Sequence, residues 1–171
     1  MRLIHAILIC LLGLSAILVW LMLIPEAEMA RGVAHPQFTA MSLGGDGERA
    51  WSIFWPIFLW QCLSIFMAHF LFALSFAPKR RRSVRPWLIV SCVVNLVVWG
   101  ALMLTYKQVL DTGTTAYVLG FPITSSWMIY GVWAGFLIPC ALYMFGFDRF
   151  IYSTEDEAKF QDILKEKHQA D

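Results

Sequence analysis

The sequence predicts an all-α integral membrane protein: a four-helix transmembrane bundle with both termini cytoplasmic and a short amphipathic C-terminal helix. Hydrophobic residues make up 59% of the 171 residues and charged residues only 15%, whereas a soluble domain carries about a quarter charged residues. Four apolar runs reach the roughly 20 residues that a helix needs to cross the bilayer core. None of these runs contains Lys, Arg, Asp or Glu.

The four runs, together with their connections, form a predicted transmembrane domain over residues 1–150, and residues 151–171 form a tail. The first run follows Arg2 but is longer than the apolar core of a signal peptide, so we interpret it as a retained helix. The predicted helices are 3–24, 51–77, 86–106 and 121–147.

The connection between the second and third runs sets the predicted orientation. Its sequence is PKRRRSVRP, and clusters of positive charge stay on the cytoplasmic side. Ten of the 13 Lys and Arg residues then lie inside, and Arg31, Arg49 and Lys107 lie outside. We interpret the cluster first as a topology signal and leave open a second role in binding lipid headgroups. Its members are Lys79, Arg80, Arg81, Arg82 and Arg85.

Polar residues inside the runs predict contacts between helices. Gln61 and Ser64 share one face of the second helix, and Asn95 of the third lies at a similar depth, near mid-membrane. Because a polar group in hydrocarbon needs a partner, we interpret these residues as contacts between helices, in which Gln61 and Asn95 could hydrogen bond to each other. A substrate or ion path is less favoured, since no acidic residue lies within the runs.

Two histidines give an alternative interpretation. His5 and His69 lie on different helices in the same leaflet and could together ligate a b-type haem, although their depths differ by about one turn. The interpretation we prefer is an interfacial His5 and a His69 bonded to a neighbouring helix. We expect no cofactor, no metal and no nucleic-acid partner. We also expect no enzyme activity, because phosphate loops, zinc motifs, nucleophile elbows and paired carboxylates are all missing.

The last run begins unusually, with the sequence GFPITSSW from Gly120. We expect Gly120 and Pro122 at the outer end of the helix, with the hydroxyls of residues 124–126 capping its free amides. Further along, Gly131 and Gly135 form a G-x-x-x-G that allows close helix packing, and Pro139 continues the same face. Whether this face meets the same chain or a partner stays open.

The tail changes character abruptly. Thr154 and Glu157 have the spacing of a capping box, and Glu155 and Lys159 that of a favourable ion pair. Three apolar residues then share one side of a short helix, which is marginal alone and is expected to dock on the membrane surface, its own bundle or a partner. They are Phe160, Ile163 and Leu164.

The last third of the chain resembles a known family. Gly120-Phe121-Pro122 opens a final membrane helix, and Phe147-Asp148-Arg149 with an acidic, amphipathic tail follows it. This order is similar to that of small bacterial membrane proteins that accompany sodium:solute symporters as a small subunit. Those subunits have two membrane helices, so the first hairpin of this chain has no counterpart. The resemblance implies an accessory subunit in the bacterial inner membrane that stabilises or regulates a larger multi-span transporter.

Two other functions remain as alternatives. The first is a membrane anchor subunit of a respiratory or redox complex, either structural or with His5 and His69 on a haem. The second is an independent transporter or channel, which would need oligomerisation because four helices without an intramembrane charge enclose no path.

Overall fold

The structure is a computed structural model that describes residues 2–26, 33–38, 40–43 and 48–170. Within these residues, four helical segments are long and apolar enough to cross a membrane, which confirms the four predicted helices. The first three are α1 (Arg2–Leu23), α2 (Glu48–Ser75) and α3 (Arg81–Thr112). The fourth is a continuous run of α4 (Ile123–Ser126), the π-helical η1 (Trp127–Val132) and α5 (Trp133–Phe145).

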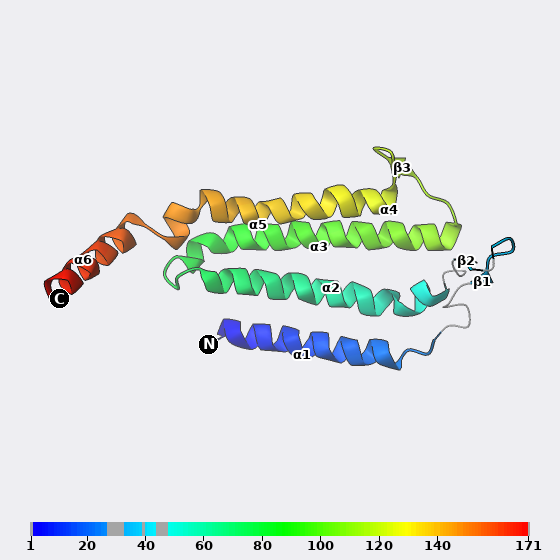
Figure 1. Cartoon of the computed structure of the whole chain (residues 1–171), viewed down its shortest axis with the longest axis horizontal. Helices are drawn as coiled ribbons and strands as arrows, with labels where there is room; N and C mark the ends of the chain where they lie inside the picture. Colours follow the sequence, from blue (N-terminus) through cyan, green and yellow to red (C-terminus); the bar gives the residue numbers. More distant parts are fainter. Residues whose placement is uncertain (1, 27–32, 39, 44–47, 171) are drawn as a thin grey trace.

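The four segments lie side by side in the order α1, α2, α3, α5, so that spatial neighbours are also neighbours in sequence (Figure 1). The expected bundle is therefore an open row, in which α1 packs mainly against α2. Closure is unnecessary in a bilayer, because lipid chains cover apolar helix faces as well as protein does. The start of α1 and the turn between α2 and α3 lie at the same end of the row, and the chain leaves the row at this end toward its C-terminus (Figure 1). We call this the basic end and the opposite one the hairpin end.

The row is completed by short elements at its two ends. At the hairpin end, β1 (Val33–Ala34) pairs with β2 (Ser42–Leu43), and β3 (Tyr117–Val118) pairs with β4 (Phe121–Pro122), both antiparallel. At the basic end, the π-helical η2 (Phe147–Ile151) leads into α6 (Thr154–Ala170), which projects beyond the row (Figure 1).

Helix α3 is the central element and is longer than predicted at both ends. It starts at Arg81 rather than at Pro86, so the arginines that follow the turn lie on helix instead of loop. It ends at Gly113, whose left-handed backbone (φ 64°) lets its amide donate to Val109 O. At 32 residues it is about 48 Å long and extends past the hydrocarbon core.

Side chains from different helices form one apolar cluster at each end of the row. At the basic end, Phe150 of η2 is buried against Phe76, which follows α2, and against Val84 and Leu88 of α3. The cluster at the hairpin end joins α2, α3 and η1 in the same way, and its buried members are Phe54, Leu102 and Met103.

Helix α3 and the last membrane segment approach each other closely at two glycines, Gly131 in η1 and Gly135 in α5. A Cβ atom at Gly135 would lie 2.7 Å from Asn95 Oδ1, and one at Gly131 would lie 2.9 Å from Val98 Cγ1. The two glycines of the G-x-x-x-G therefore face α3 of the same chain. Gly100, on the same central helix, has nothing within 4 Å of its added Cβ.

We expect Gly135→Ala to destabilise the protein by about 1–3 kcal/mol, because the new methyl group displaces the Asn95 amide from a packed site. Gly100→Ala is the matched control and should leave stability unchanged or raise it, since its methyl group meets open space. Thermal unfolding in mild detergent, followed by circular dichroism, measures both. Equal midpoints for the two variants would contradict the close contact.

Candidate functional site

A polar contact in the middle of the row joins α2 to α3. His69 Nδ1 lies 2.8 Å from Ile65 O, and His69 Nε2 lies 3.0 Å from Ser91 Oγ. Because a carbonyl oxygen only accepts, Nδ1 carries the proton and Nε2 accepts from the Ser91 hydroxyl. Ser91 is fully buried, so this bond satisfies a hydroxyl that has no access to water.

This geometry bears on the haem alternative. Both ring nitrogens of His69 are engaged, and the ring is directed toward α3. His5 lies on α1, which packs against the opposite side of α2 from α3. Ligation of an iron by His69 would require the Ser91 bond to break. Among the described residues, no cluster of three or more His, Cys, Asp or Glu side chains is placed to hold a metal ion.

A second polar contact joins α3 to α5. The buried Asn95 amide donates from Nδ2 to Ser91 O at 2.9 Å and to Gly135 O at 3.2 Å. Asn95 and Gln61 do not hydrogen bond to each other, because the Asn95 amide group bonds to the backbone of Ser91 and of Gly135 instead. Ser64 donates instead to Trp60 O in its own helix. The half-buried Gln61 forms no hydrogen bond within the described part of the chain.

The start of the last membrane segment differs from the prediction. Gly120 and Leu119 form the two-residue turn of the β3–β4 hairpin, both with positive φ (85° and 52°), as a type I′ turn requires. Pro122 ends β4, immediately before α4. Ser126 does not cap an amide: its hydroxyl donates back to Val118 O at 2.8 Å, which ties the hairpin to the helix. The Thr124 hydroxyl is buried and has no partner among the described residues.

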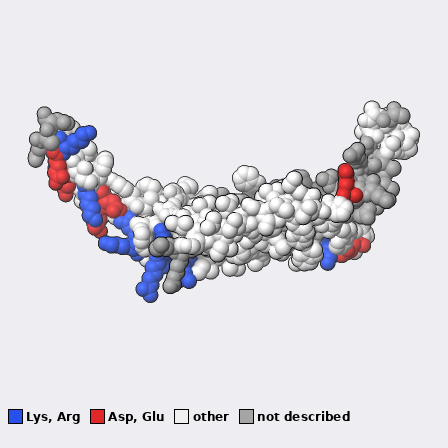
Figure 2. Space-filling model, turned by 90° about the horizontal axis from the view of Figure 1, so that it is seen from below, with Lys and Arg blue, Asp and Glu red and all other residues white. Residues whose placement is uncertain are grey.

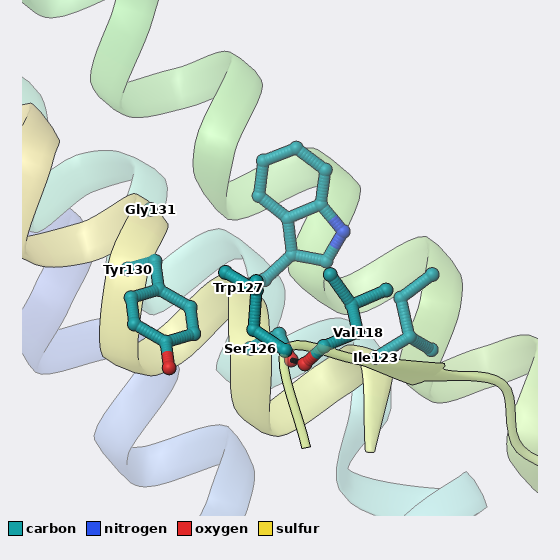
Figure 3. Close-up of a pocket in the computed structure, with 7 residues that line it drawn as sticks. Val118, Ile123, Ser126, Trp127, Tyr130 and Gly131 are labelled. Carbon is teal, nitrogen blue, oxygen red and sulfur yellow. Dashed lines mark hydrogen bonds between the residues drawn. The ribbon is translucent and has the colours of Figure 1, made fainter. Parts of the chain in front are cut away.

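The tied hairpin leaves a pocket of about 350 Å³ against η1 (Figure 3). The Trp127 and Tyr130 side chains extend from the helix, and Val118 and Ile123 lie beside Ser126. None of the residues that line the pocket is charged, and its polar side chains are those of Ser126 and Tyr130. Its lining residues are Val118, Leu119, Ile123, Ser126, Trp127, Tyr130 and Gly131.

A charged contact at the basic end holds the start of α6 against the turn between α2 and α3. The Arg80 guanidinium donates to Ile151 O at 3.0 Å, to Ser153 Oγ at 2.6 Å and to Asp156 Oδ2 at 2.6 Å. We call these contacts the Arg80 clasp. They join segments more than 70 positions apart, so they decide where α6 leaves the membrane part.

The clasp also caps α6. Asp156 accepts from the Ser153 backbone amide at 3.0 Å, which places the capping pair one residue before the predicted Thr154 and Glu157. These amide and guanidinium donors lower the pKa of Asp156 from 3.8 to about 2. The predicted ion pair between Glu155 and Lys159 is confirmed, with a separation of 2.6 Å.

Beyond the clasp, α6 makes few contacts with the rest of the described chain. Phe160 is 51% exposed and Ile163 is 62% exposed, although they share a side of the helix with the partly buried Leu164. Of the three docking surfaces left open by the sequence, the chain's own bundle therefore does not cover this face. Helix α6 therefore has an exposed apolar face, and the Arg80 clasp holds this helix in a defined position.

The arrangement distributes the predicted site residues among separate places. The contact between α3 and the last membrane segment holds Asn95, Gly131 and Gly135. Pro139 is buried further along α5. Comparison of the chain with protein-family models, curated proteins and solved structures gives no match.

We expect Asp156→Asn to weaken the Arg80 clasp, because it removes the charge that accepts three hydrogen bonds, from the Arg80 guanidinium and from the backbone amide and hydroxyl of Ser153. Amides of residues 152–157 should exchange hydrogen roughly threefold faster or more, measured by mass spectrometry. Asp162→Asn is the control, since Asp162 is exposed and lies 3.6 Å from Lys165 outside the clasp. Equal exchange in both variants would contradict the role of Asp156.

The lowered pKa of Asp156 fixes the pH dependence of the same measurement. The contribution of the carboxylate is complete above its ordinary pKa of 3.8 and is lost as the pH falls through its pKa of about 2 in the folded protein. Protection of residues 152–157, corrected for intrinsic exchange, should therefore fall between about pH 4 and pH 2. In Asp156→Asn this transition should be smaller, with only the part that comes from the hydrogen-bonded Glu155 and Glu157 left.

Proposed function

We propose that this protein is an accessory subunit that assembles with a larger membrane transporter and stabilises or regulates it. The observation that carries the proposal is the position of α6, which the Arg80 clasp holds beyond the row with Phe160 and Ile163 exposed. A short helix with an uncovered apolar face gains stability when a partner covers that face.

The charge of α6 favours a protein partner over the membrane surface. Helix α6 carries five acidic residues and three lysines, whereas helices that lie on anionic membranes are rich in Lys and Arg. A groove with an apolar floor and basic rims would be complementary to α6. The basic end is cytoplasmic by the charge bias of the loops, so this groove belongs to the cytoplasmic side of the partner.

A second contact with the partner is available inside the membrane. Gln61 lies in the apolar part of α2 without a hydrogen bond among the described residues, and an amide in hydrocarbon is stabilised by a polar group on a neighbouring helix. The other polar side chains of the central contact, His69, Ser91 and Asn95, bond to one another or to the backbone of their own chain.

The partner class that we propose is a sodium:solute symporter of the bacterial inner membrane. The resemblance in the last third of the chain supports this choice, and the absence of acidic residues from the four apolar runs agrees with it. In such a complex the larger subunit would hold the ion and substrate sites, and this chain would contribute contacts only.

Affinity purification of the tagged protein in mild detergent tests the assembly. We expect a stoichiometric multi-span transporter that is lost with the double variant Phe160→Ser/Ile163→Ser. The matched control Gln161→Ser/Asp162→Ser alters two residues on another side of α6 and should retain the partner. Equal recovery with both variants would contradict the role of α6. An absorption spectrum with a Soret band, or recovery of respiratory subunits, would overturn the proposed function.

We expect Gln61→Leu to weaken the complex but not the isolated protein, because the amide bonds to the partner rather than to its own chain. The loss should be about 0.6 kcal/mol, the average for polar contacts in membranes, and up to about 1.7 kcal/mol. Ser64→Ala is the control, since Ser64 bonds to its own helix. Dissociation of the complex on dilution in detergent measures the difference, and equal affinities for the two variants would exclude Gln61 from the contact.

A further inference from the structure

The basic residues of the turn after α2 and of the first turns of α3 divide into two groups with different surroundings. Arg80 faces the protein and forms the clasp with α6. Arg82 and Arg85 are exposed, and no hydrogen bond or ion pair engages them within the described residues. Figure 2 shows blue Lys and Arg side chains gathered at this end of the molecule and extending from one face. A role in orientation alone does not require this division.

Helix geometry places three of the arginines on one arc. With about 100° between successive residues, Arg81 and Arg85 are about 40° apart and Arg82 lies about 60° further on. Arg81 is half-buried, and one of its terminal nitrogens donates to Phe76 O at 3.1 Å. Its Nε is buried and has no partner among the described residues. The arc therefore combines two exposed guanidinium groups with a third whose donors are only partly used.

An apolar track continues from this arc toward the middle of the membrane. Ile89, Val93 and Val97 follow Arg85 at steps of four on successive turns of α3, and because each step turns by about 40°, the track winds around the helix by about 120° from Arg85 to Val97. They are 51%, 52% and 63% exposed. Trp87, 59% exposed, lies at a height between Arg85 and Ile89 but on another side of α3, at the depth where aromatic rings favour the interface.

We propose that this face of α3 binds one anionic phospholipid. Arg81, Arg82 and Arg85 hold its phosphate, because guanidinium groups bond phosphate oxygens in pairs and keep their charge at the membrane surface. An acyl chain of the same lipid lies along Ile89, Val93 and Val97. The junction of a cationic arc with an apolar track fits a molecule with a phosphate and a hydrocarbon chain better than it fits free phosphate.

Native mass spectrometry of the full-length protein in mild detergent tests the site. The probes are phosphatidylglycerol and phosphatidylcholine with identical acyl chains, and we expect one phosphatidylglycerol molecule to be retained selectively. Arg82→Gln/Arg85→Gln should reduce its affinity at least about fivefold. The control Lys79→Gln/Arg149→Gln removes the same charge at the same end of the molecule and should reduce the affinity less than twofold.

Two results would overturn the proposal. Equal losses in the two double variants would mean that the total charge, rather than the arc, attracts the lipid. Displacement of the lipid by glycerophosphoglycerol, the headgroup without acyl chains, at similar concentrations would mean that the track contributes nothing. Thermal unfolding in lipid-free detergent should be the same for both double variants, which keeps a folding defect distinct from lost binding. The outcome is independent of the proposed assembly with a transporter.

Discussion

Two buried polar residues on α3, Ser91 and Asn95, determine how the membrane part is arranged. In hydrocarbon their hydroxyl and amide groups have no water to bond, so each must find an acceptor or donor on protein. Ser91 bonds to the His69 ring on α2, and Asn95 bonds to the backbone that Gly135 exposes on α5. Helix α3 is thereby joined to both neighbours by residues about one helical turn apart. The apolar clusters at the two ends of the row add packing to the arrangement that these two polar contacts define.

The membrane segments were predictable from the sequence, whereas the partners of their polar side chains were not. Hydropathy and the absence of charge identify runs of about 20 residues, because the bilayer imposes that length. The partner of Asn95 depends on which backbone lies within reach. A glycine supplies an acceptor that sequence spacing does not reveal, since every residue carries a carbonyl group. Gln61 has a more conspicuous side chain, but Gly135 brings its backbone closer.

The residue at which a helix begins was also predicted less well than the existence of the helix. The third apolar run begins at Pro86, directly after the basic cluster, so the third helix was predicted to start there. The structure continues the helix back to Arg81, which changes a loop of positive charge into an arc of arginines. Arg80 lies just before that arc and takes a different role through Asp156, a residue far away in sequence. Charge counting treats the whole cluster alike, whereas only tertiary structure separates the clasp from the exposed group.

The hydroxyl groups outside the central contacts limit where a partner can be recognised within the membrane. Ser15, Ser64 and Thr105 each donate to a carbonyl one turn earlier in their own helix. These hydroxyls are therefore not free to bond to a partner, and the apolar faces of the row are covered by lipid chains as well as by another helix. Gln61 differs from these hydroxyls, because its side chain forms no hydrogen bond within the described part of the chain. Specific recognition is consequently expected at Gln61 and in the aqueous helix α6, where a wrong partner would leave an amide unpaired or an apolar face uncovered.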